Sequence, residues 1–248
     1  MTRDRPQKGN PHRLTIKQHV LPTRSIERFA EVDGTVSVQI VSENKRLKLR
    51  PDNPLFCANW KWDQRAEGGY MRGIERQFQD LAERIVHGMN SISPREYPTV
   101  TNFFSLWHLR AKHRDEPFPP QSISGVHNQN LTKNQEEILE RKHCGFVRQD
   151  QTIPGQQILG LRIQMEIDWM ENQLEGAHWG VVKAMDGEFI VPDTFGGTAI
   201  VPLSPNLCLV AGYGDAELPR SEVAAVNRLA HSAAVNYCIA RNFAACPE

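Results

Sequence analysis

Residues 178–213 read HWGVVKAMDGEFIVPDTFGGTAIVPLSPNLCLVAGY, and this stretch decides the fold. Asp186-Gly187 separates two runs of β-prone residues, and glycine tolerates the positive φ that a type I′ turn requires. The pattern therefore predicts a β-hairpin with arms at residues 178–185 and 188–193. Two more apolar runs follow the Gly196-Gly197 loop, so we expect the strand-rich centre of the fold here.

A second hairpin is predicted nearer the N-terminus. Residues 35–41 alternate between apolar and polar side chains, and residues 46–50 alternate again. Such alternation is typical of strands that bury one face. The second arm would place Arg46, Lys48 and Arg50 on one side of the hairpin.

Helical spacing dominates the middle of the chain. Between residues 71 and 89, apolar side chains recur at steps of four, three, four and four, which gives one stripe along a helix; they are Ile74, Phe78, Leu81, Ile85 and Met89. A second helix is expected after Pro98. A third is expected after Thr132, where Gln135 completes a capping box.

Two further helices are expected toward the C-terminus. Residues 155–172 are apolar on several faces, which predicts a helix buried by neighbours on more than one side. Pro219 suits the first turn of a last helix. The stripe of that helix would be Val223, Val226, Ala230, Ala233 and Tyr237.

The order of these elements predicts an α+β fold. We expect a small antiparallel sheet, formed by the N-terminal and C-terminal hairpins, packed against a bundle of central helices. The predicted organisation is a flexible N-terminal arm (1–14), a single domain (15–242) and a C-terminal tail (243–248). Residues 114–130 contain three prolines and many polar residues, which indicates a surface loop.

Overall charge points to no class of partner, because Lys plus Arg and Asp plus Glu both number 29. The distribution is uneven. Residues 1–50 hold eleven Lys/Arg against five Asp/Glu, whereas residues 166–217 hold nine Asp/Glu against one Lys. These segments are either two solvated faces, or the N-terminal one is a basic surface that meets phosphates.

The five cysteines show neither a Cys-x-x-Cys pair nor a metal-ligand spacing, which favours a reducing cytoplasm. The N-terminus lacks the apolar segment of a signal peptide. Nowhere do eighteen apolar residues run together, so no membrane association is expected.

Arg110 and Asp193 are the first candidates for chemistry. Arg110 follows Phe103 by seven residues and so shares its apolar helix face. An arginine there is either paired with a carboxylate of the fold or clamps a ligand phosphate. Asp193 stands just before the Gly196-Gly197 loop, where an aspartate either catalyses or forms a turn.

His19, Asn227 and Glu75 complete the candidates. His19 is either structural or a proton-transfer group near neutral pH. Asn227 borders the inner stripe of the last helix and could bind substrate or satisfy loop backbone groups. Glu75 lies at the edge of the stripe of helix 71–89 and is either an ordinary solvated glutamate or a substrate-binding residue. Walker, Gly-x-Ser-x-Gly, His-Glu-x-x-His and Rossmann glycine patterns do not occur in the sequence.

Several short motifs resemble the bacterial domain-of-unknown-function family 4238. Its members open with Gln-His-Tyr-Val-Pro followed by Phe-Ala, and this chain has Gln-His-Val-Leu-Pro at residues 18–22 and Phe29-Ala30. Further similarities are Ile74-Glu75, the Ser-Leu-x-x-x-Arg of residues 105–110, Trp179, Asp193, Pro202-Leu203-Ser204-Pro205 and Asn227. Some relatives are encoded among anti-phage defence genes, which implies a defence or toxin-like role.

Two functional hypotheses follow. The chain is a defence or toxin-like effector acting on nucleic acid or a nucleotide, in which His19 transfers protons, Arg110 clamps phosphate and Asp193 is a base or a ligand of a divalent metal. Alternatively, it is a non-catalytic sensor or protein-binding module in which the same residues form a buried structural network. The catalytic hypothesis requires His19, Arg110 and Asp193 to share one pocket.

Overall fold

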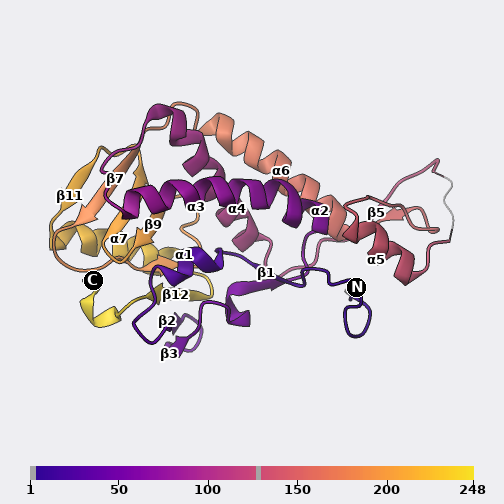
Figure 1. Ribbon diagram of the computed structural model, residues 1–248, viewed down its shortest axis with the longest axis horizontal. Coiled ribbons are helices and arrows are strands. Elements are labelled where there is room, and N and C mark those ends of the chain that lie inside the picture. Colours follow the sequence, from indigo (N-terminus) through magenta and orange to yellow (C-terminus); the bar gives the residue numbers. More distant parts are fainter. Residues whose placement is uncertain (1–3, 127–129) are drawn as a thin grey trace.

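The computed structural model describes residues 4–126 and 130–248. Its long axis follows three helices, of which α4 packs against both α3 and α6 (Figure 1). The helices are α1 (Thr23–Glu27), α2 (Gln64–Ala66), α3 (Arg72–Val86), α4 (Tyr97–Lys112), α5 (Lys133–Arg141), α6 (Gly155–Gln173) and α7 (Arg220–Ala233). A single π-turn, Glu67–Met71, joins α2 to α3.

Two four-stranded sheets lie at the end of the molecule where α7 packs (Figure 1). The first has the order β11-β7-β10-β9, with β7 (Trp179–Ala184), β9 (Ile200–Ser204), β10 (Leu207–Ala211) and β11 (Ala216–Leu218). The second has the order β3-β2-β12-β8, with β2 (Val36–Ile40), β3 (Lys45–Leu49), β8 (Val191–Pro192) and β12 (Tyr237–Ala240).

Two short antiparallel pairs complete the strands. β1 (Lys17–His19) pairs with β4 (Cys57–Asn59), and β5 (Gln121–Ser122) pairs with β6 (Thr152–Ile153). The α+β class is therefore confirmed. The N-terminal hairpin β2–β3 and the hairpin β9–β10 both form, but they lie in different sheets rather than in one.

The predicted hairpin at Asp186-Gly187 is wrong, although Gly187 does have a positive φ of 93°. β7 pairs with β10 and, in parallel, with β11, whereas β8 pairs with β12 in the other sheet. The turn therefore carries the chain from one sheet to the next. The positive φ of Gly187 was expected, but Asp186 lacks the positive φ that a type I′ turn also needs, and the partners of each strand come from distant parts of the sequence.

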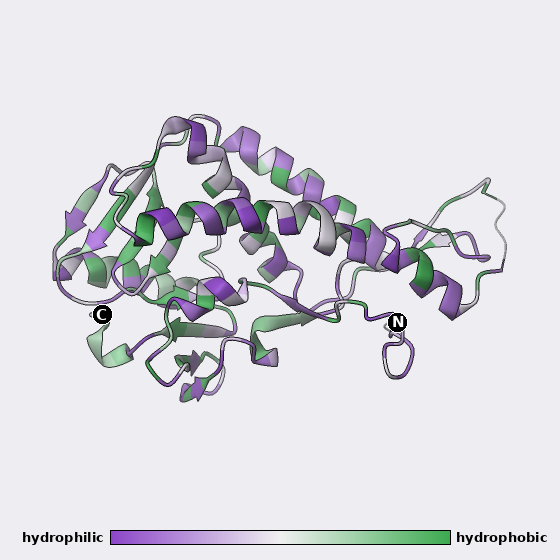
Figure 2. Ribbon diagram, in the orientation of Figure 1, coloured by the Kyte–Doolittle hydropathy of each residue, from purple (hydrophilic) through white to green (hydrophobic). Residues whose placement is uncertain are grey.

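The predicted helices are confirmed in α3, α4, α5, α6 and α7. Thr132 and Gln135 form the expected capping box at the start of α5. Figure 2 shows hydrophobic and hydrophilic segments alternating along α3, as an amphipathic stripe requires. Tyr237, expected on the stripe of the last helix, lies instead in β12.

The expectation that helix 155–172 is buried on several sides is wrong. α4 takes that position between two neighbours, with Val100, Phe103, Phe104, Leu106, Trp107 and Leu109 all buried. α6 lies on its outer side and buries Leu159, Ile163 and Ile167. Leu161, Met165 and Trp169, which lie off this buried stripe, are exposed.

The N-terminal residues in the described part of the chain lie against α5. The backbone N–H of Gln7 donates to Glu137 at 2.6 Å, and Arg148 joins Asp4 to Glu136 at 2.9 Å and 2.8 Å. Residues 1–3 and 127–129 lie outside the described residues, so flexibility of residues 1–14 stays a prediction. Within the described residues, no helix combines the length and the apolar character of a membrane span.

Candidate functional site

Three of the five candidate residues converge on one groove. His19 from β1, Glu75 from α3 and Arg110 from α4 line a hollow of about 490 Å³. The other lining residues are Thr15, Lys17, Pro22, Thr23, Arg24, Glu67, Arg72, Arg76, Gln79 and Asp80. We call this set the charged groove; it draws on three segments of the chain, residues 15–24, residues 67–80 and Arg110.

Strand and helix periodicity explain how the groove is lined. Side chains alternate along β1, so Lys17 and His19 share one face while Gln18 is buried on the other. The Gln18 amide accepts from the backbone N–H of Lys61 at 2.7 Å and donates to the carbonyl of Trp62 at 2.8 Å. This pair of bonds fixes the orientation of β1.

The first turns of α3 supply the opposite wall. Arg72 and Arg76 are four residues apart, as are Glu75 and Gln79, and such spacing places both pairs on neighbouring parts of one helix face. Asp80 also lines the groove.

Arg110 is a buried ion-pair partner. It is 1% exposed, and its Nη1 donates to a carboxylate oxygen of Glu75 and to the carbonyl oxygen of His19 at 3.2 Å. Its Nη2 lies 3.4 Å from Glu67, whose carboxylate also accepts from the indole of Trp62. Burial alone would lower the pKa of Arg110, but the two carboxylates outweigh it and raise that pKa. Of the two alternatives for Arg110, the structure therefore favours the ion pair.

His19 is half-buried beside this ion pair. Burial lowers the pKa of its imidazole. A hydrogen bond to the backbone of Pro51 and the charge of Glu67 both oppose this shift without reversing it. Nε2 lies 3.1 Å from the hydroxyl of Thr23. Since the net shift is downward from 6.5, the ring is mostly neutral at pH 7.

Exposed cations line the same groove as the imidazole. Lys17, Arg72 and Arg76 all line the groove, and within residues 4–126 and 130–248 none of them forms an ion pair with a carboxylate. Arg24, in contrast, lies 3.4 Å from Glu83. Against these three positive charges the groove holds one carboxylate, Asp80, without an ion pair among the described residues, so the cations are in excess and can meet an anion.

Asp193 is not part of the groove, so the expected trio with His19 and Arg110 in one pocket is wrong. It is 2% exposed and accepts from the backbone N–H groups of Val235 at 2.8 Å and Asn236 at 2.9 Å, and from the Asn236 amide at 2.8 Å. Burial raises the pKa of this carboxyl, and these hydrogen bonds oppose the shift. Asp193 therefore closes the turn between α7 and β12.

Asn227 is also remote from the groove. Its side chain is fully buried in α7 and accepts from the N–H of Ile190 at 2.9 Å. It donates to the carbonyl oxygens of Glu188 and Pro247, both at 2.9 Å. These bonds satisfy backbone groups of Glu188 and Ile190, which lie between β7 and β8. Asn227 does not line the charged groove, so it cannot bind a substrate there as predicted.

Sequence reasoning missed Lys17, Glu67, Arg72 and Arg76. Lys17 could have been found from its two-residue spacing to His19, and Arg76 from its place beside Glu75. Glu67 had no helical pattern to mark it, because it lies in the π-turn. Among the described residues, no group of three His, Cys, Asp or Glu is placed to hold a metal ion.

Comparisons with family models, with curated proteins and with solved structures found no match to this chain, so the resemblance to family 4238 stays a prediction.

Proposed function

We propose that the charged groove binds a phosphate group of a nucleic acid or nucleotide, and that His19 transfers a proton to or from that ligand. One observation carries this proposal. An imidazole that is mostly neutral at pH 7 shares a groove with Lys17, Arg72 and Arg76, whose charges are not taken up by carboxylates among the described residues.

The cations suit a phosphate in particular. Guanidinium groups present paired N–H donors that match two phosphate oxygens, and lysine adds a compact point charge. Arg72 and Arg76 lie one helical turn apart on α3, so both can address neighbouring oxygens or neighbouring phosphates.

The position of His19 suits proton transfer during phosphoryl transfer. Its Nε2 would take the proton from an attacking hydroxyl or water as a new P–O bond forms. The departing oxygen would take a proton from the imidazolium as the old P–O bond breaks. The charges of Glu67 and Glu75 stabilise the imidazolium in between.

Arg110 has a positioning role in this proposal. It donates to the backbone carbonyl of His19 and holds Glu67 and Glu75 beside the ring. The resemblance to family 4238 adds the proposal that the biological role is a defence or toxin-like effector. A divalent metal ion stays a candidate cofactor for the same chemistry.

The test is incubation of labelled RNA, DNA and nucleotides with the purified protein, with and without Mg²⁺. We expect His19→Ala to keep ligand binding and to slow product formation at least about 100-fold. Arg72→Ala/Arg76→Ala should weaken binding itself. The matched control is Arg95→Ala/Arg141→Ala, which removes the same charge from exposed positions outside the groove. Equal losses in the two double variants would overturn the proposal.

A second candidate is the non-catalytic sensor or protein-binding module. The observation in its favour is that Arg110, Asp193 and Asn227 all make buried polar contacts within the fold. It predicts that the wild-type protein binds a phosphorylated ligand with the same dependence on Arg72 and Arg76 but forms no product under any condition.

A further inference from the structure

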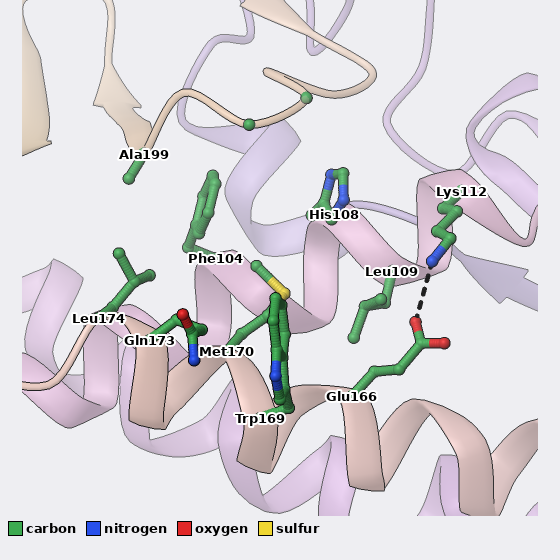
Figure 3. Close-up of a pocket in the computed structure, with 12 residues that line it drawn as sticks. Phe104, His108, Leu109, Lys112, Glu166, Trp169, Met170, Gln173, Leu174 and Ala199 are labelled. Carbon is green, nitrogen blue, oxygen red and sulfur yellow. Dashed lines mark hydrogen bonds and ion pairs between the residues drawn. The ribbon is translucent and has the colours of Figure 1, made fainter.

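A second hollow lies on the other side of α4, away from the charged groove. It has a volume of about 520 Å³ and is enclosed by α4, α6 and the loop between β8 and β9. Figure 3 shows Phe104 and His108 pointing from α4 toward the loop between β8 and β9, and Trp169 and Met170 extending from α6 toward α4. We call it the aromatic pocket.

Its walls are mostly apolar. Phe104, Leu109, Met170 and Leu174 contribute side chains, and Gly196 and Gly197 of the loop leave one wall without any. A Cβ built on either glycine would meet no atom within 4 Å, so the loop keeps this side open. The volume lies within the range of sites that enclose a small organic molecule.

Trp169 is unusual among the tryptophans of this protein. All five lie in the described residues; Trp60, Trp62, Trp107 and Trp179 are at most 5% exposed, whereas Trp169 is 62% exposed. A large indole left in water beside an apolar hollow marks a place where burial by a ligand would be favourable.

The remaining lining residues point to a ring-shaped ligand. The rings of Phe104 and His108 are nearly parallel, with centroids 6.4 Å apart and an interplanar angle of 15°. Met170 adds a thioether, which contacts aromatic edges favourably. At one end of the pocket Lys112 donates to Glu166 at 3.1 Å, and at the other end the amide of Gln173 lies beside Leu174 (Figure 3).

We propose that the aromatic pocket binds a planar aromatic small molecule of about two fused rings, which would lie between Trp169 and the rings of Phe104 and His108. A polar substituent would point toward Lys112 and Glu166. This site is separate from the charged groove, and its occupancy does not depend on the function proposed for that groove.

The test uses N-phenyl-1-naphthylamine, whose fluorescence rises in an apolar site, with the full-length protein. Tryptophan excitation should yield energy transfer to the bound dye, and dye added to saturation should quench the emission of the exposed Trp169 most. We expect Trp169→Ala to weaken binding at least tenfold. Ala199→Phe, which adds a ring to a lining position, should abolish it while the melting temperature stays that of the wild type.

Met165→Ala is the matched control. Met165 lies one turn before Trp169 on α6, is 71% exposed and does not line the pocket. We expect this variant to bind the dye like the wild type. Equal weakening by Met165→Ala and Trp169→Ala would overturn the proposal, because the dye would then coat the outer face of α6.

Competition tests the planar character of the ligand. We expect 2-naphthol to displace the dye at a concentration at least tenfold lower than its saturated counterpart decahydro-2-naphthol. Equal potency would refute an aromatic ligand. A wild-type dimer in sedimentation experiments that dissociates in Trp169→Ala would also refute it, since a second copy would then cover the pocket.

Discussion

Asp193 illustrates at the residue scale how a buried carboxylate becomes structural. Its two oxygens accept three hydrogen bonds from Val235 and Asn236, at the point where α7 ends and β12 begins. Removal of the carboxylate leaves three part-buried N–H donors without this partner, and it also removes the bonds that hold the turn.

We therefore expect Asp193→Ala to lower the free energy of unfolding by about 3 kcal/mol. The measurement is urea denaturation, with Asp193→Asn as the variant that keeps one acceptor oxygen. Phosphate binding in the charged groove should be unchanged in folded Asp193→Ala. If the variant kept its stability but lost phosphate binding, Asp193 would have to be assigned to the functional site.

Arg110 is the second residue whose role is decided by its partners. Arg110→Ala would leave the carboxylates of Glu67 and Glu75 together without their cation. Removal of one partner of a buried ion pair costs about 3–5 kcal/mol. We expect a loss of that order in urea denaturation, and a partial recovery when Glu75→Gln is added, because the repulsion between the two carboxylates then disappears. Strictly additive effects would contradict this coupling.

At the scale of elements, close approach of helices depends on single glycines. A Cβ on Gly160 of α6 would lie 2.6 Å from Oδ1 of Asp63, which caps α2 by accepting from Ala66. Asp63 cannot withdraw without losing that cap. α6 therefore packs on α2 only if position 160 lacks a side chain.

Gly160→Ala should destabilise the protein by about 1–3 kcal/mol through overpacking, although alanine favours helices. Gly73→Ala in α3 is the control, because its Cβ would meet no atom within 4 Å. That variant should unfold at the same or a higher temperature than the wild type. Thermal unfolding of both variants separates packing from helix propensity; an equal effect in the two would contradict the packing explanation.

The contact of α5 with its neighbours carries a pH dependence. Burial raises the pKa of Glu140 to about 7, while the indole of Trp60 donates to its carboxylate at 3.0 Å and opposes the shift. Its pKa in the unfolded chain is near 4.5. A raised folded-state pKa means that the contribution to stability is complete below pH 4.5 and is lost as the pH rises through 7.

We expect the free energy of unfolding of the wild type to fall by about 3 kcal/mol between pH 4.5 and 8 because of Glu140. In Glu140→Gln this decrease should be absent. Glutamine keeps an acceptor for Trp60 and carries no charge at any pH. Urea denaturation at pH 5 and pH 8 provides the measurement. A difference between variant and wild type that is the same at both values would refute the assignment to Glu140.

At the scale of the whole molecule, the formal net charge is zero, so any attraction for nucleic acid must be local. Lys17, Arg72 and Arg76 provide three cations in the charged groove. If each meets one phosphate of single-stranded RNA, the slope of log affinity against log salt should be about −2.

Arg72→Ala/Arg76→Ala should reduce that slope to about −0.7, because one cation then remains. Fluorescence anisotropy with labelled RNA between 50 and about 200 mM salt measures it. The Arg95→Ala/Arg141→Ala control should keep the wild-type slope. A slope that does not respond to Arg72 and Arg76 would place RNA binding elsewhere on the protein.

Periodicity in the sequence was sufficient for most of the elements. The stripe from Ile74 to Met89, the capping box at Thr132 and the alternation in residues 35–50 each depend on neighbours within a few positions. Arg110 also followed from local context, because an arginine on an apolar helix face needs a partner, whereas His19 was selected for the chemistry of imidazole and Glu75 for its place at the edge of a helix stripe.

The sequence by itself thus determined which segments are helices or strands and which polar residues need partners. Only the tertiary structure decided which residues and strands are those partners. β8 pairs with β12 rather than with β7. Asp193 accepts hydrogen bonds from the turn after α7 and does not lie with His19. Trp169 on α6 is exposed beside a pocket. Such pairings depend on long-range packing, in which distant segments compete for the same strand edge or charge, and no local pattern records the outcome.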